Sequence, residues 1–93
     1  MTKMMILAVF RSRSQSIDYA MRLQNYGIMA ETVPTPKEAK IGCGICVRFD
    51  ARSFVRAKAV LNRFRYSAFK GFYKVEYRAG RAVILPIDNK SPQ

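Results

Sequence analysis

Apolar and polar residues follow one another along the chain in blocks that predict strands and helices in a definite order. A continuous apolar run from Met4 to Phe10, bounded by charged residues, is typical of a central strand. A helix should follow, capped by Ser14 or Ser16 and ending near Gly27. Its apolar positions recur at helical spacing, and they are Ile17, Ala20, Met21 and Leu23.

The next segment predicts two further strands. Residues 28–33 are strand-like and are stopped by Pro34 and Pro36. Beyond a polar loop, apolar residues alternate with Cys46, Arg48 and Asp50, which is the pattern of a half-buried strand. The apolar members of this alternation are Ile45, Val47 and Phe49.

A second helix and one or two strands complete the pattern. Asp50 or Ser53 can cap a helix with an apolar stripe formed by Phe54, Ala57, Leu61 and Phe64. The other face of this helix is basic and carries Arg52, Arg56 and Arg63. Residues 72–77 are aromatic-rich and strand-like, and Ala79-Gly80 can turn the chain into an extra strand at residues 81–85.

This order of elements is that of the ferredoxin-like split βαβ sandwich, an α+β fold. We expect residues 1–87 to form a single domain and residues 88–93 to be a flexible polar tail. Right-handed crossovers and the usual strand order 4-1-3-2 bring three loops to one end of the sheet. Residues 11–14, 40–43 and 66–70 should therefore meet, with Phe10-Arg11 beside Gly42-Cys43.

The charge of the chain bears on its partners more than on its fold. The 93 residues include 17 Lys and Arg and 6 Asp and Glu, a formal net charge of +11. This balance favours an anionic partner, such as nucleic acid, a phosphate compound, an acidic protein surface or anionic lipid; a solvated basic surface is the alternative. No apolar run approaches the length of a membrane span, and no signal-peptide pattern is present. We expect a cytoplasmic protein with no membrane partner and with reduced thiols.

Composition also excludes several kinds of chemistry. The chain has no histidine and two cysteines, Cys43 and Cys46, which excludes His-based catalysis, His-Cys metal sites and a disulfide scaffold. No second cysteine pair completes a zinc site. The carboxylates are scattered, with no pair placed for acid-base work. We therefore expect no metal and no cofactor, and a carrier or binding protein rather than a conventional enzyme.

Cys43 has more of the features of a reactive thiol than Cys46. It lies between Gly42 and Gly44, which leave its sulfur open and allow unusual backbone angles. Free N–H groups of the first helix favour a thiolate there, as do the positive charges of Arg11, Arg13 and Lys40. Cys46 lies inside a strand, where cysteine is commonly a small buried apolar residue.

Whether the two cysteines form a disulfide stays open. Three strand residues span about 10 Å and place the two side chains on opposite faces of the sheet. A disulfide needs Cα atoms within roughly 7 Å, so the chain would have to curl out of the strand around Cys43 and Gly44.

The stretch "VFRSRSQSIDYAMRLQNYGIMAETVPTPKEAKIGCGICVRF" resembles the selenium/sulfur (Se/S) carrier protein-like family, a domain of unknown function. The shared features are a strand ending in Phe, a serine-containing loop, a Gly-Ile turn, a P-x-P segment and a Cys-Gly before an apolar strand. In this chain they are Phe10, Ser12 or Ser14, Gly27-Ile28, Pro34-Thr35-Pro36 and Cys43-Gly44. With "GFYKVEY" as the closing strand, the resemblance covers residues 5–78. It implies that Cys43 accepts sulfur or selenium.

Three hypotheses follow. In the first, Cys43 holds a persulfide or selenopersulfide obtained from a donor such as a cysteine desulfurase, and Cys46 resolves it if the two sulfurs are close. The residues expected to bind the anion or an acidic protein partner come from two loops, and they are Arg11, Ser12, Arg13, Ser14, Lys40, Gly42 and Gly44. In the second, the chain is an interaction or regulatory domain that forms a homodimer through the open sheet face. In the third, less favoured because an RNP1 pattern is absent, it binds RNA through Phe72, Tyr73 and Tyr77.

Overall fold

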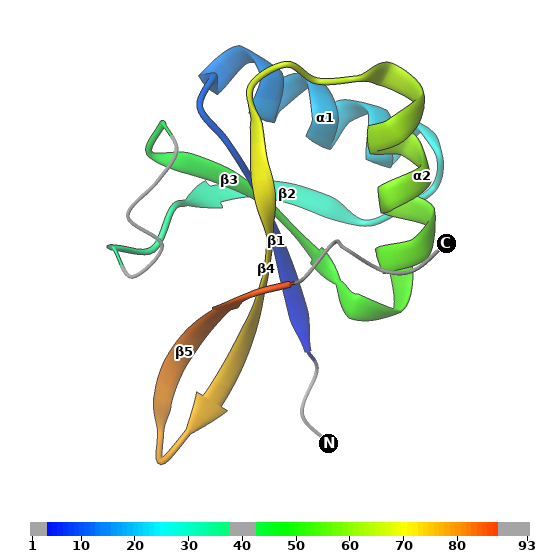
Figure 1. The fold of residues 1–93 in the computed structure, drawn as a ribbon. Helices are drawn as coiled ribbons and strands as arrows, with labels where there is room; N and C mark the ends of the chain where they lie inside the picture. Colours follow the sequence, from blue (N-terminus) through cyan, green and yellow to red (C-terminus); the bar gives the residue numbers. More distant parts are fainter. Residues whose placement is uncertain (1–3, 38–42, 88–93) are drawn as a thin grey trace.

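The computed structural model describes residues 4–37 and 43–87. Within them the chain forms five strands and two α-helices, and a short 3₁₀ turn (η2, Ala51–Ser53) precedes the second helix. The elements follow in the order β1 (Met5–Phe10), α1 (Arg13–Asn25), β2 (Ala30–Pro34), β3 (Ile45–Asp50), α2 (Phe54–Phe64), β4 (Phe69–Arg78) and β5 (Arg81–Pro86) (Figure 1). The sequence predicted every one of these strands and helices, although β2 begins two residues later than expected and β4 three residues earlier. The predicted tail at residues 88–93 lies outside the described residues.

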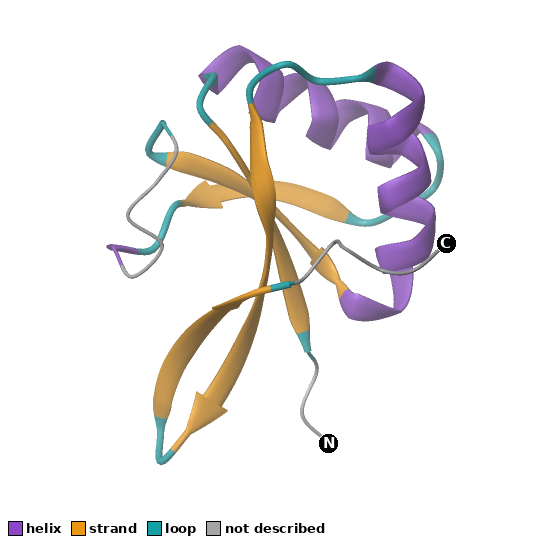
Figure 2. Ribbon diagram, viewed as in Figure 1, coloured by secondary structure: helices purple, strands orange, loops and turns teal. Residues whose placement is uncertain are grey.

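The strands form one antiparallel sheet in the order β2-β3-β1-β4-β5. From β4 to the β2 edge, the strands lie in the order 4-1-3-2. The extra strand β5 pairs with β4 on its other side. Both helices cover the same face of the sheet (Figure 2). The fold is therefore α+β, with a helix layer on a five-stranded antiparallel sheet. No helix among the described residues is long and apolar enough to cross a membrane.

The main core lies between the sheet and the helices. Successive strand side chains point to opposite faces, so β1 and β3 each contribute alternate residues to it. The residues that bury their side chains there include Ile6, Ala8, Phe10, Val47, Phe49, Phe72, Tyr19, Leu23, Ala57 and Leu61. A smaller cluster of Leu7, Val9 and Cys46 lies on the other face of the sheet. The alternation predicted for β3 is thus confirmed.

The first helix is rotated slightly from its predicted orientation. Ala20 and Leu23 are buried as expected, but Ile17 is 41% exposed and Met21 is 56% exposed. The buried stripe runs instead through Ser16, Tyr19, Ala20 and Leu23. Residues three and four apart share one face of a helix. Ile17 and Met21 each follow a residue of the buried stripe, so their side chains point away from the core.

The start of α1 also differs from the prediction. Ser12, and not Ser14 or Ser16, caps the helix, and its Oγ accepts a hydrogen bond from the backbone N–H of Gln15 at 3.2 Å. Ser12 has extended backbone angles, φ −106° and ψ 124°, which place its hydroxyl opposite the free N–H groups of the first turn. Asp50 caps the short η2 turn and not α2 itself, because its carboxylate accepts from the N–H of Arg52 at 2.8 Å. Ser53 is the residue before α2, and its side chain makes no capping hydrogen bond.

The β4–β5 hairpin extends away from the helices (Figure 1). Ala79 and Gly80 form its turn with φ values of 52° and 78°. Positive φ at both central residues is the type I′ geometry that suits the twist of a two-residue hairpin. The predicted turn is therefore confirmed.

Candidate functional site

Cys43 lies at the end of the sheet where β1 finishes and β3 begins. Its backbone N–H donates to the carbonyl oxygen of Phe10 at 3.1 Å. The N–H of the next residue, Arg11, donates to the carbonyl oxygen of Ala68 at 2.8 Å, which brings the α2–β4 loop to the same end. Three of the predicted neighbours are thus together: the start of α1, Cys43 and the loop after α2. Lys40 and Gly42, which were also expected here, lie outside the described residues.

Gln15 fixes the α2–β4 loop against α1. Its Nε2 donates to the Ser67 hydroxyl at 3.0 Å, and its Oε1 accepts from the backbone N–H of Ala68 at 2.9 Å. The sequence had given Gln15 no role, because a glutamine in the first turn of a helix is ordinary. One side chain therefore satisfies a donor and an acceptor of a loop that begins about fifty residues later in the chain.

A second polar group holds the same loop. The Tyr66 hydroxyl donates to Asp18 Oδ2 at 2.6 Å, and Arg22 Nε donates to the same oxygen at 2.8 Å. The hydrogen bonds from Tyr66 and Arg22 lower the pKa of Asp18. Burial, followed by the contact with Asp18, raises the pKa of Tyr66. The aromatic ring of Tyr66 packs edge-on against Phe10, so this network continues directly into the core beside the site.

The Cys43 thiol is partly exposed and has two polar neighbours. Its Sγ lies 3.6 Å from the carbonyl oxygen of Ile45, which can accept from the thiol. The Ser16 hydroxyl lies 3.9 Å from the same sulfur. Gly44 adopts φ +101°, an angle that favours glycine, and a side chain built there would meet no atom within 4 Å. Gly44 thus provides the open space and the unusual backbone angle that the sequence predicted beside Cys43.

Ser16 is a site residue that the sequence did not identify. It is fully buried, and its Oγ also donates to the carbonyl oxygen of Ser12 at 3.2 Å. A signal for it was present in the sequence: Ser16 is the one polar residue on a helix stripe that continues through Tyr19, Ala20 and Leu23. A hydroxyl at such a position needs a partner inside the protein.

The basic loop, residues 11–14, is exposed at this end of the molecule. Arg11, Arg13 and Ser14 are exposed, and Ser12 is half-buried because it caps α1. Within residues 4–37 and 43–87, neither arginine forms an ion pair with a carboxylate. Their charge is therefore open to an anionic partner or to a charged sulfur.

Cys46 lies on the other side of the sheet. It is fully buried, opposite Val9 of β1 and Val33 of β2, and it packs with Leu7. Burial raises the pKa of this thiol, and the nearby Thr35 hydroxyl offsets part of that rise. Both cysteines are free thiols. Cys43 contacts Ser16 in the helix layer and Cys46 contacts the opposite layer, so the structure does not bring them together as a disulfide pair.

The aromatic residues considered for RNA binding are not presented as a set. Phe72 is 1% exposed, and its ring packs edge-on against Phe49 and Phe54 in the main core. Tyr73 is partly buried on the opposite face, against the Leu7 cluster. Of the three, Tyr77 alone is largely exposed, at 63%. Adjacent strand residues point to opposite faces, which separates Phe72 from the two tyrosines.

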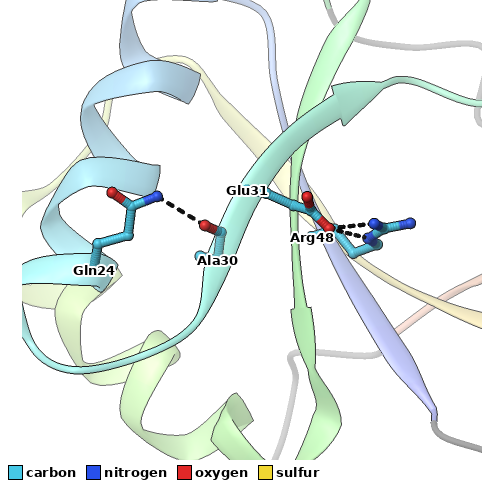
Figure 3. Close-up of polar contacts among 4 residues, drawn as sticks. All are labelled: Gln24, Ala30, Glu31 and Arg48. Atoms are coloured by element: carbon cyan, nitrogen blue, oxygen red, sulfur yellow. Dashed lines mark hydrogen bonds and ion pairs between the residues drawn. The ribbon is translucent and has the colours of Figure 1, made fainter.

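A hollow of about 900 Å³ lies at the end of the sheet remote from Cys43, beside the start of β2. Three of the polar side chains that line it, those of Gln24, Glu31 and Arg48, already contact protein groups (Figure 3). Gln24 Nε2 donates to the carbonyl oxygen of Ala30 at 2.8 Å, and Arg48 forms an ion pair with Glu31. The hollow therefore offers less unmet polar chemistry than the Cys43 end. Among the described residues, no group of three or more Cys, Asp or Glu side chains is placed to hold a metal ion.

Comparison with known proteins adds one finding. The family model described as "Putative Se/S carrier protein-like" matches residues 5–74, from the start of β1 to the middle of β4. Comparisons with curated proteins and with solved structures gave no match. The matched span contains Cys43, Ser16 and the basic loop, and it ends before the β4–β5 hairpin turns.

Proposed function

Because the chain belongs to the Se/S carrier protein-like family, we propose that it carries sulfur or selenium on Cys43. The observation that supports this proposal most is the setting of Cys43 within the matched span. It is a free, partly exposed thiol beside a polar hydroxyl and next to an exposed basic loop. Cys46 is also a free thiol, but it is fully buried among apolar side chains on the other face of the sheet, where a donor cannot reach it without local opening.

The proposed loading step is an exchange between persulfides. The Cys43 thiolate attacks the outer sulfur of a donor persulfide, R–S–SH, of the kind that a cysteine desulfurase forms. A new S–S bond forms at Cys43 while the S–S bond of the donor breaks, and the donor leaves as the thiolate R–S⁻. One persulfide replaces another, so the step has no net oxidation or reduction. A donor of the form R–S–SeH gives a selenopersulfide on Cys43 by the same exchange.

The unloading step repeats the exchange toward an acceptor. An acceptor thiolate attacks the outer sulfur or selenium, the bond to Cys43 breaks, and Cys43 returns to the thiolate. Arg11 and Arg13 support both steps, because positive charge favours an anionic sulfur and attracts the acidic surface of a protein partner. We propose no resolving role for Cys46, since it lies on the other face of the sheet.

We also assign the fold to the ferredoxin-like split βαβ class, with β5 as an addition. The order β1-α1-β2-β3-α2-β4, the antiparallel sheet and the location of both helices on one face support this assignment. In this arrangement the loops before α1 and before β4 share one end of the sheet. That end is where Cys43 lies.

The test is sulfur loading followed by intact-protein mass spectrometry. The protein is incubated with a cysteine desulfurase and cysteine, and we expect the mass of one added sulfur atom. The Cys46→Val variant should load as the parent protein does, and Cys43→Ser should not load. Absence of sulfur on Cys43, under conditions in which an established carrier protein is loaded, would contradict the proposal.

A further inference from the structure

The Ser16 hydroxyl contacts Cys43, and this contact is not needed to form the helix. Ser16 is fully buried, and no other serine, threonine, amide or charged residue among the described ones is buried. Its Oγ donates to the carbonyl oxygen of Ser12 at 3.2 Å, but that oxygen already accepts the backbone N–H of Ser16 at 3.0 Å. Alanine at this position would raise helix propensity and would bury no hydroxyl. Helix stability alone therefore does not account for a serine here.

The remaining contact of this hydroxyl is with the reacting sulfur. Ser16 Oγ lies 3.9 Å from Cys43 Sγ, and the thiol hydrogen of Cys43 can point to the carbonyl oxygen of Ile45 at 3.6 Å. When Cys43 ionises, the sulfur loses its donor and becomes a charged acceptor. The Ser16 hydrogen can then rotate from Ser12 toward the sulfur. Rotation leaves no group unsatisfied, because the Ser12 carbonyl keeps its backbone hydrogen bond.

From this geometry we propose that Ser16 is the hydrogen-bond donor that stabilises the anionic sulfur of Cys43. The inference deepens the proposed carrier function and rests on Cys43 being its reacting residue. A donor to a charged acceptor contributes more than a neutral hydrogen bond, and a buried hydroxyl is shielded from competing water. The same donor serves the thiolate before loading and the thiolate released on unloading. Ser16 thus favours the anionic form at both ends of the transfer cycle.

The effect of other charged groups on the Cys43 sulfur must be distinguished from the effect of Ser16. Arg11 follows the residue whose carbonyl oxygen binds Cys43 N–H, and Arg13 begins α1; both are exposed and have no carboxylate partner among the described residues. The neighbouring α2–β4 loop contributes the neutral side chains of Ser67 and Ala68, which Gln15 contacts. It also contains the exposed Arg65 and the Tyr66 hydroxyl, which donates to Asp18. Exposed charges are screened by salt, whereas a buried hydroxyl contact is not. Salt dependence therefore distinguishes the two contributions.

The experiment measures the alkylation rate of Cys43 by iodoacetamide across pH in a Cys46→Val background. We expect Ser16→Ala to slow alkylation at neutral pH by about three- to tenfold, with the profile shifted to higher pH and the plateau rate unchanged. The slowing should persist at high salt. Ser53→Ala is the matched control, because Ser53 lies at the end of the sheet remote from Cys43 and its side chain makes no capping hydrogen bond to α2; it should stay within about twofold of the parent.

Two results would overturn the inference. One is a Ser16→Ala profile that coincides with that of Ser53→Ala. The other is an equal loss of rate at every pH, which would mark a distorted site and not a lost donor. Alkylation in denaturing urea should be the same for all variants, which confirms that the effect needs the folded protein. Because alkylation needs no sulfur donor, this measurement can support Ser16 even if sulfur loading fails, and it can fail while loading succeeds.

Discussion

The two cysteines lie three residues apart in the sequence and occupy opposite surroundings in the structure. Cys43 lies in a bend at the end of the sheet, is partly exposed, and has the Ser16 hydroxyl as a neighbour. Cys46 lies in the middle of three paired strands, is fully buried, and packs with Leu7 and Val9 on the other face. The sheet itself separates the two thiols.

This difference shows how a C-x-x-C spacing depends on the element that carries it. At a helix start, positions three apart share a face; along a strand, they point to opposite faces. Here Gly44 bends the chain at Cys43 and β3 has begun by Cys46. We therefore expect Cys43 to matter for chemistry and Cys46 to matter for stability, and the two should respond in opposite ways to the same treatment.

The largest expected effect is on thiol reactivity in the folded protein. Single-cysteine variants, Cys46→Val and Cys43→Ser, allow each thiol to be alkylated separately under native conditions. Cys43 should react at least about 100-fold faster, because the fully buried Cys46 requires a local opening of the strands before a reagent can reach it. Comparable rates for the two variants would mean that Cys46 is far more accessible than its packing indicates.

The converse effect is on stability. Cys46→Ala removes a buried sulfur from the Leu7 and Val9 cluster, and it should lower the free energy of unfolding by about 1–2 kcal/mol. Cys43→Ala removes a partly exposed side chain and should change the free energy of unfolding by less than about 0.5 kcal/mol. Urea titration of both variants checks the comparison, and a larger loss for Cys43→Ala would reverse the roles assigned to the two residues.

A smaller effect concerns the hydroxyl beside Cys46. Thr35 Oγ1 is buried and has no hydrogen-bond partner among the described residues. Thr35→Val keeps the shape and removes this unsatisfied group, so it should stabilise the protein by about 0.5–1 kcal/mol in urea titration. Thr32→Val, at an exposed position of the preceding strand β2, is the control and should be close to neutral.

Much of the fold could be predicted because its determinants are local. The apolar run of β1, the prolines after β2 and the alternation of β3 each specify one element, and the element order then restricts the topology. These features also placed Cys43 beside the end of β1, which the hydrogen bond to Phe10 confirms.

The details of the site could not be predicted, because they depend on a rotation of α1. Ser12, Ser14 and Ser16 alternate in the sequence, and each is a good cap. Successive helix residues lie about 100° apart around the helix axis, so a shift in the helix start or a rotation of the helix changes which side chains face the sheet. That shift decides that Ser12 caps the helix, that Ser16 is buried beside Cys43, and that Ile17 is exposed.

The smallest expected effect is a pH dependence at the Cys43 end that the Cys46 face should not share. Asp18, bound by Tyr66 and Arg22, has its pKa lowered below the ordinary value of 3.8. A carboxyl with a depressed pKa in the folded state stabilises it above the unfolded pKa, and this contribution is lost as pH falls through the folded pKa. Because Asp18 and Arg22 are partly exposed, the loss should be below about 1 kcal/mol.

Asp18→Asn should therefore remove part of the acid sensitivity of unfolding below about pH 4 and leave stability at neutral pH only slightly reduced. The same change should loosen the α2–β4 loop that Tyr66 holds, and amide hydrogen exchange should rise at Ala68 and Phe69, whose N–H groups are hydrogen-bonded to Gln15 and Tyr66. Exchange at Val9 and Val47 should not change, since these residues lie in the central strands of the sheet and are fully buried. Equal increases at both places would mean that the two ends of the sheet open as one unit, and the contrast between the two cysteines would then be one of position and not of local stability.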